Sequence, residues 1–477
     1  MVWIGLFLHD ASKYVESHPY LRFNNYMKIL LLLILSSFAG QAFAQVNFMV
    51  EKFHRLNDPG VTTRSEDRLN LDIKQEGDFL LIDQAEAKFD SSFRLYLDDQ
   101  EINYSLSEAY IKKSDGTNTF TIGRKILDWN PNEVFWGLSN LNSRRSFSLL
   151  DEKQEGLIGF HWDRKMGDLE LNFILSYLFV PQLNPGLKVE NGKVTSKSEW
   201  IRRPPERTII NEKEVPIYYN LNDPQIKDVL LNKTLGANLT WHWSDKQTAG
   251  KLNTYLLYKP ENNLRVNAEA YYDLDLKQVT VNADPVVNHH GVIGFGVEQK
   301  IPTIVKGETI LHANLEVIDP NAKLGKDFDV LDPIKLKQEN REFDSDFFSI
   351  KPNYKRESHT TLALTHKNYY LDFGLNYFRL LTEASSGDDF YSDSSRFENA
   401  VGFWLQVKPS EQLTWLVDLK HDLSRKDILL RTNVSYLFTN NFVTAVGVEM
   451  LQAEDMSSFW SSYRANDSIY FSMGYSF

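Results

Sequence analysis

The last ten residues of the chain decide its fold class. They are Ser468-Ile469-Tyr470-Phe471-Ser472-Met473-Gly474-Tyr475-Ser476-Phe477. Successive side chains of an extended strand point to opposite faces, so every second residue shares a face. One such face is entirely apolar and consists of Ile469, Phe471, Met473, Tyr475 and Phe477. The other face holds mostly small or polar residues, and the segment is therefore predicted to be an amphipathic strand.

This ending resembles the C-terminal signature of outer-membrane β-barrels, in which the last strand closes on a terminal aromatic residue such as Phe477. In that family the barrel assembly machinery recognises such an ending, so the resemblance implies that machinery as a partner. A soluble β-sandwich can also end in a strand, but rarely on a bare aromatic residue.

Strand-like alternation recurs upstream at a similar length. The predicted strands are 84–97, 103–113, 118–127, 155–163, 168–180, 233–243, 251–259, 264–272, 277–283, 290–300, 307–318, 359–366, 369–380, 397–407, 412–423, 427–437, 442–451 and 468–477. Bacterial single-chain barrels have an even number of strands, and the pattern predicts about 18, with about 16 as the alternative. We therefore expect an all-β, transmembrane, antiparallel up-and-down barrel over residues 84–477. Residues 45–83 are expected to form a periplasmic or inward-lying segment.

Loop lengths predict the orientation of this barrel. Short turns such as 408–411 and 439–441 alternate with long segments such as 128–154, 181–232 and 319–358. Membrane barrels place short turns in the periplasm and long loops outside the cell. The last strand then runs towards a periplasmic C-terminus.

The N-terminal region carries an export signal. Residues 27–44 combine Lys28, an apolar run from Ile29 to Leu35 and the small-residue site Ala42-Phe43-Ala44, which is the pattern of a signal peptide removed before Gln45. Residues 1–26 do not resemble a targeting signal, and we expect them to be a mis-called upstream extension before a true start at Met27. A genuine cytoplasmic extension before a signal anchor is the alternative.

Composition excludes several classes of protein. The chain has 477 residues and no cysteine, so it has neither a disulfide framework nor a lipidated cysteine after the signal. Its net charge of −12 argues against nucleic acid as a partner. Outside the signal, no stretch approaches the ~20 apolar residues of a membrane helix.

Aromatic residues near strand ends fit the two interfaces of a bilayer. Trp241, Trp243 and Tyr255 are examples, and interfacial girdles of this kind are typical of membrane barrels. A sugar-stacking path is the alternative interpretation.

One internal segment carries a narrower resemblance. Glu108-Ala109-Tyr110 is followed by Gly123-Arg124-Lys125 and then by Trp136-Gly137. This series resembles the E-A-Y strand, G-R-Q strand and W-G loop of porin-like barrels, including the alginate-export type and poorly characterised relatives. It departs from that pattern at Lys125, where glutamine is common, and in an insertion between Trp129 and Trp136. The resemblance implies shared barrel ancestry but no shared substrate.

The same segment contains candidate lumen residues. A charge that faces lipid costs a few kcal/mol, so Glu108 and Arg124, placed near opposite ends of one hairpin, are expected to face the lumen. The following loop adds four more charges: Asp128, Glu133, Arg144 and Arg145. If the loop folds into the barrel, these residues form a charged constriction that selects by size and charge. If it does not, they form salt bridges on a solvated surface loop.

The predicted function is a porin-like channel in the cell outer membrane that passes small polar or charged solutes. The chain shows no nucleophile elbow, H-E-x-x-H pair or P-loop, and we predict neither an enzyme nor a cofactor or metal. Outer-membrane lipid and lipopolysaccharide are expected partners, and the sequence leaves the oligomeric state open. An export-linked barrel with partner-binding loops is the second interpretation, and a barrel hydrolase is the third.

Overall fold

The structure is a computed structural model, and it describes most of the chain from Gln45 onward. The described residues are 45–57, 65–78, 85–97, 101–145, 148–182, 188–196, 198–201, 203–210, 212–222, 224–244, 248–273, 276–302, 306–320, 349–350, 356–382, 395–439, 441–455 and 458–477. The predicted signal peptide and upstream extension lie outside them and remain predictions. Among the described residues, no helix is long and apolar enough to cross a membrane.

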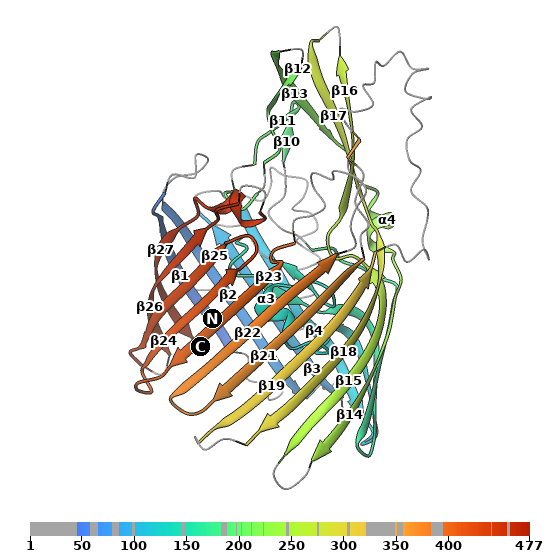
Figure 1. Cartoon of the computed structure of the whole chain (residues 1–477). Helices are drawn as coiled ribbons and strands as arrows, with labels where there is room; N and C mark the ends of the chain where they lie inside the picture. The colour runs from blue at the N-terminus through green and yellow to red at the C-terminus, as the bar shows by residue number, and fades with distance from the viewer. Residues whose placement is uncertain are drawn as a thin grey trace, which may run out of the picture.

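Eighteen strands form one closed barrel (Figure 1). In order around the barrel they are β1 (Gln45–Arg55), β2 (Ser65–Asp78), β3 (Ala85–Tyr96), β4 (Glu101–Ser114), β5 (Asn118–Lys125), β8 (Leu157–Met166), β9 (Leu169–Ser176), β14 (Thr234–Ser244), β15 (Ala249–Pro260), β18 (His289–Ile301), β19 (Glu308–Asp319), β21 (Glu357–Lys367), β22 (Leu371–Thr382), β23 (Asn399–Val407), β24 (Leu413–Asp422), β25 (Ile428–Leu437), β26 (Phe442–Gln452) and β27 (Ser468–Ser476). Each strand pairs antiparallel with the next, and β27 pairs with β1 from Asn47↔Ser476 to Arg55↔Ser468. The predicted fold class is confirmed.

Two parts of the predicted strand assignment are wrong, although the total is right. Residues 45–55 and 65–78 belong to the barrel wall as β1 and β2, not to a periplasmic or inward-lying segment. Their many charged residues hide the alternation, because their inward faces pair charges inside the lumen. The predicted strands 264–272 and 277–283 form a hairpin outside the barrel, β16 (Arg265–Asp273) and β17 (Gln278–Val286).

That hairpin belongs to a second sheet of five strands. With β12 (Arg207–Ile210), β13 (Lys213–Leu221) and β20 (Ser349–Ile350), β16 and β17 stand above the loop end of the barrel (Figure 1). Its core contains Val215, Ile217 and Val279. The remaining short elements are α3 (Glu133–Trp136), β6 (Ser143–Arg145), β7 (Lys153–Glu155), β10 (Val189–Glu190), β11 (Lys193–Val194), α4 (Ile226–Leu230) and η3 (Trp460–Tyr463).

Alternation along β27 separates a lipid-facing side from a lumen-facing side. Ile469, Phe471, Met473 and Tyr475 are 41–44% exposed, whereas the intervening Tyr470 is buried. The other strands repeat this pattern, as with Leu256 of β15, which is 59% exposed. A continuous outward apolar band and a wall without unpaired edges are what a bilayer requires of a β-structure. The chain is therefore a membrane-spanning barrel.

The C-terminus lies beside a short turn. Asn441 Nδ2, in the turn between β25 and β26, donates to Ser476 O at 2.8 Å. The short turns that follow β23 and β25 thus share one end of the barrel with the C-terminus, and the described parts of the long connections share the other end (Figure 1). This arrangement is the one that loop lengths predicted.

The girdle interpretation holds for Trp241 and fails for Tyr255. Trp241 lies near the short-turn end of β14 and is 48% exposed. Tyr255 faces the lumen, is 1% exposed and donates its hydroxyl to Glu316 Oε1 at 2.5 Å. An aromatic residue with one polar atom suits both the bilayer interface and the polar lumen. The register of the strand decides which of the two a given residue faces.

A charge placed on the lipid-facing band should destabilise the barrel. We expect Leu256→Arg to lower the free energy of unfolding by about 2–4 kcal/mol, the cost of arginine near the bilayer midplane. Urea unfolding in lipid vesicles measures this. Ile209→Arg is the matched control, because Ile209 is 70% exposed on the five-stranded sheet outside the barrel, and it should change stability by less than about 0.5 kcal/mol. Equal effects of both variants would contradict the assigned lipid face.

Candidate functional site

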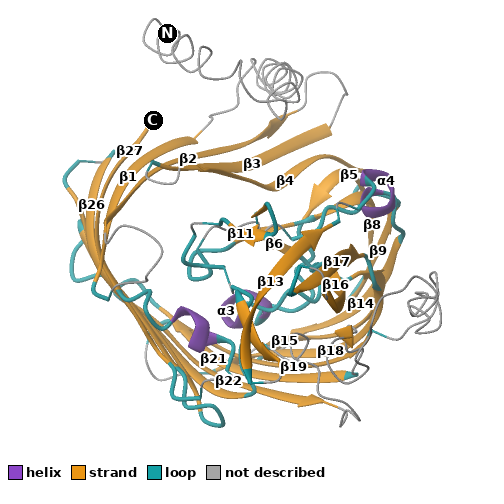
Figure 2. Cartoon of the chain, turned by 90° about the horizontal axis from the view of Figure 1, so that it is seen from above, coloured by secondary structure: helices purple, strands orange, loops and turns teal. Residues whose placement is uncertain are grey.

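The segment between β5 and β8 folds inside the barrel in both of its described parts, residues 126–145 and 148–156. Seen along the barrel axis, α3 and β6 lie within the ring of wall strands (Figure 2). Asn132 Nδ2 donates to Thr361 Oγ1 of β21 at 3.0 Å, and Asn253 Nδ2 of β15 donates to Trp129 O at 2.8 Å. These hydrogen bonds attach the segment, which we call the inner loop, to one side of the wall.

The far end of the inner loop is attached to the opposite side of the wall. Arg94 of β3 forms an ion pair with Asp151 at 2.6 Å, and Arg431 Nη1 of β25 donates to Leu150 O at 3.2 Å. Burial by itself raises the pKa of Asp151, but the guanidinium groups of Arg94 and Arg431 outweigh it and hold that pKa below its ordinary value. The loop therefore spans the lumen, and its charges are paired where water is scarce.

The Trp136-Gly137 pair explains one of the motifs in the sequence. Trp136 is 1% exposed and packs against Phe378 of β22, with ring centroids 5.6 Å apart. Gly137 ends α3 with φ at 68° and donates its backbone N–H to Val134 O. Glycine adopts this left-handed conformation at little cost. The motif thus turns the chain and buries an indole against the wall.

Glu133 organises the inner loop around its carboxylate. It is fully buried and accepts hydrogen bonds from Leu141 N at 2.8 Å, Asn142 Nδ2 at 3.0 Å and Gln154 Nε2 at 3.1 Å. Burial raises the pKa of the Glu133 carboxyl to about 7, although the nearby Arg144 opposes that rise. Desolvation therefore outweighs the hydrogen bonds made to the charged form.

Arg144 joins the backbone of Glu133 to the carboxylate of Glu152. Its guanidinium donates to Glu133 O at 2.6 Å and to Leu138 O at 2.7 Å, and it lies 3.4 Å from Glu152 Oε2. Glu152 also binds Arg396, in the connection that precedes β23. Removing one partner of a buried ion pair of this kind destabilises the fold, because the remaining charge is left buried and uncompensated.

Glu108 and Arg124 lie at the same end of their hairpin, which corrects the predicted placement at opposite ends. Ala109 pairs with Arg124, because both residues are about equally far from the turn at 115–117. Glu108 forms an ion pair with Lys88 at 2.6 Å, and Arg124 forms one with Glu155 at 2.8 Å. Arg145 lies 3.3 Å from the same Glu155.

The predicted constriction residues therefore divide into two groups. Five of them bind the inner loop to the wall or hold it together, and they do not line the luminal pocket: Glu108, Arg124, Glu133, Arg144 and Arg145. Asp128 alone of the six lines that pocket, and its side chain is exposed. Lys125, the position that departs from the family pattern, lines it as well.

The pocket is a cavity of about 250 Å³ between the wall and the inner loop. Seven consecutive wall strands contribute to it: β5, β8, β9, β14, β15, β18 and β19. Residues 126–129, 131 and 132 of the inner loop complete the lining. A cavity of this size, bounded by a loop fixed inside an 18-stranded wall, can hold a small solute.

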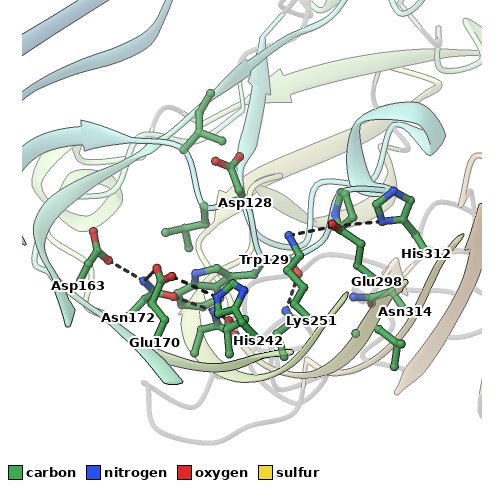
Figure 3. Close-up of a pocket in the computed structure, with 18 of the residues that line it drawn as sticks. Asp128, Trp129, Asp163, Glu170, Asn172, His242, Lys251, Glu298, His312 and Asn314 are labelled. Carbon is green, nitrogen blue, oxygen red and sulfur yellow. Dashed lines mark hydrogen bonds and ion pairs between the residues drawn. The ribbon is translucent and has the colours of Figure 1, made fainter. Parts of the chain in front are cut away.

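Ionic groups form two clusters on either side of the pocket (Figure 3). In the first, Asp163 binds Lys125 at 2.6 Å, and Asn172 donates to both Asp163 and Glu170 at 2.9 Å. His242 approaches Glu170 at 3.5 Å.

In the second cluster, Glu298 lies 3.0 Å from Lys251 and 3.5 Å from His312. With the histidines neutral, the four carboxylates and two lysines that line the pocket leave a net charge of −2.

The sequence analysis did not identify the wall residues that line this pocket. It also did not identify the segment around Glu199, between β9 and β14, as one that contacts the wall. Lys251, Glu298 and His312 occupy inward positions of predicted strands, so the polar face of each alternation could have indicated them. Glu199, in the connection between β9 and β14, binds Arg55 of β1. No periodic signal marks that contact, which joins residues 144 positions apart.

Comparisons with known proteins find similarity of structure but not of sequence. No protein-family model matches the chain, and no curated protein matches it in sequence. A BenF-like porin from Pseudomonas fluorescens Pf-5 has a TM-score of 0.49 at 8% identity, covering 92% of this chain and 98% of that chain. OccAB1 of Acinetobacter baumannii has a TM-score of 0.48 at 10% identity (92% and 97%), and OccK5 (OpdH) of Pseudomonas aeruginosa has 0.47 at 9% (92% and 99%). At these values none of them determines the function of this chain.

The buried Glu133 predicts a dependence of the inner loop on pH. Its pKa of about 7 in the docked loop lies above the ordinary value, so the docked state binds the proton more tightly. The free energy of docking of the inner loop therefore becomes less favourable as pH rises from about 4.5 to about 7, by at most about 3 kcal/mol. We expect brief high-conductance events in a planar bilayer to be more frequent at pH 8 than at pH 5.

Glu133→Gln is the matched variant for this test, because it keeps the shape and removes the titration. Its event frequency should be the same at both pH values. A wild-type frequency that stays constant, or that falls as pH rises, would contradict the assignment.

Proposed function

We propose that this chain is an outer-membrane channel through which small polar or charged solutes diffuse. The closed wall and the outward apolar band support a place in a bilayer. The signal peptide predicted at 27–44 supports export across the inner membrane, and β-barrels of this kind belong to the outer membrane of Gram-negative cells. Lipid, lipopolysaccharide and the assembly machinery that would recognise Phe477 are proposed on the same grounds.

The observation that carries this proposal is the inner loop fixed across the lumen beside a charged pocket. A barrel of 16–18 strands leaves an aqueous channel unless loops narrow it. Here a loop attached to β3, β15, β21 and β25 narrows it. Charged groups in such a constriction select solutes by size and charge without any chemical step.

The extracellular sheet favours a second function, that of an export-linked or structural barrel with partner-binding loops. The sheet stands clear of the wall (Figure 1) and exposes Ile209, which is 70% accessible. Such a barrel would bind a partner through this sheet without conducting small ions freely. Conductance separates the two functions.

Single-channel recording of refolded Gln45–Phe477 in planar bilayers tests the proposal. We expect stable openings in the wild type. Replacing residues 131–151 by a short Gly-Ser linker should raise the conductance at least about twofold, because it removes the body that narrows the lumen.

Replacing residues 265–286 by the same linker is the control, since it removes a hairpin of similar length from the extracellular sheet. Its conductance should match that of the wild type. A folded, heat-modifiable barrel that never conducts would contradict the channel proposal and favour the partner-binding function.

A further inference from the structure

The carboxylates of the luminal pocket are not equivalent. Asp163, Glu170 and Glu298 each have a lysine, histidine or asparagine partner within 3.5 Å. Among the residues that the structure describes, Asp128 has no hydrogen-bond or ion-pair partner, although it lines the pocket and its side chain is exposed. In Figure 3 it lies between the two ionic clusters, beside Trp129 and without a contact line.

Two buried amides of the same pocket also keep an atom without a partner. Asn238 is 3% exposed and its Oδ1 accepts no hydrogen bond from the described part of the chain, whereas Asn314 is 5% exposed and its Nδ2 donates none to that part. Buried polar atoms are seldom left in this state, so each one calls for a ligand or water. An acceptor and a donor are thus available along with the free carboxylate.

The balance of charge determines which solute would gain most from these groups. The lining carries a net −2 with neutral histidines, so an anion would be repelled and a cation attracted. The two lysines are held by Asp163 and Glu298, so Asp128 and Glu170 are the carboxylates without a lysine partner. Glu170 accepts a hydrogen bond from Asn172 and lies 3.5 Å from His242, which leaves Asp128 as the carboxylate most free to form a new charge-assisted hydrogen bond.

We propose that the luminal pocket is a binding site for a small organic cation, with Asp128 accepting hydrogen bonds from its ammonium group. The inference rests on the proposed channel function and names its substrate class. The volume of about 250 Å³ limits the solute to a small molecule. Asn238 and Asn314 bind the hydroxyl or amide groups of that solute, so a polar ammonium compound is preferred to an apolar one.

Current block in planar bilayers tests this proposal with two probes of similar size and opposite charge. Ethanolammonium chloride should interrupt the potassium current of the wild type, and sodium glycolate should not. Asp128→Asn should weaken the ethanolammonium block about tenfold, which corresponds to about 1.4 kcal/mol. Asp128→Glu, which keeps the charge, should retain most of the block.

Asp228→Asn is the matched control, because it makes the same change on the exposed helix α4, and its block should equal that of the wild type. Equal block by both probes, or an unchanged block in Asp128→Asn, overturns the proposal while the channel function stands. If Asp128→Asn fails to insert, the comparison of the two probes on the wild type decides. Absence of any conductance in the wild type refutes the proposed function itself.

Discussion

The antiparallel pairing of β27 with β1 is the contact on which the rest of the structure depends. In a bilayer, an unpaired backbone N–H or C=O costs several kcal/mol, so a sheet can cross only if its first and last strands meet. Nine residue pairs join the two strands, from Asn47↔Ser476 to Arg55↔Ser468. Closure at 18 strands fixes the circumference of the wall, and with it a lumen too wide for side chains alone to fill.

That width explains why so much charge is buried in this molecule. A loop crossing the lumen finds two apolar patches on the wall, while most other inward-facing side chains are polar. The inner loop is held by ion pairs and hydrogen bonds, as with Arg94–Asp151 and Glu152–Arg396, and by packing on these patches. Aromatic rings meet at both patches, where Trp136 packs against Phe378 and Phe397 and where Trp129 packs against Tyr255. Because buried ion pairs fix geometry more than they add stability, this construction favours one defined position of the loop.

Sequence alone could predict the wall but not its contents. Period-two alternation is a local property, and it located β27, β26 and most other strands. It failed at β1 and β2, where charged residues face a polar lumen and blur the contrast between the two faces. It also could not distinguish β16 and β17 from wall strands, because a hairpin alternates in the same way on either side of the rim. The strand count came out right because these two errors cancelled.

The candidate site could be predicted in composition but not in role. The sequence indicates a functional segment from Glu108 to Arg145, and the part of it that follows β5 crosses the lumen. Which charges face a solute, however, is decided by contacts between residues far apart in sequence, such as Arg94 with Asp151. Contacts of this kind engage Arg124, Glu133, Arg144 and Arg145 in hydrogen bonds and ion pairs, whereas Asp128 faces the pocket. The register of the wall, which sets this outcome, cannot be obtained from local pattern.

The central claim is that the inner loop resides across the lumen, and one measurement tests it most directly. The chain has no cysteine, so Asn132→Cys with Thr361→Cys introduces a single pair at positions whose side chains now share a hydrogen bond. Single-channel conductance is recorded before and after oxidation of that pair. We expect the disulfide to form readily and the conductance to stay the same, because the loop already occupies the locked position. Failure to form the disulfide, or a conductance that drops on oxidation, would contradict the account.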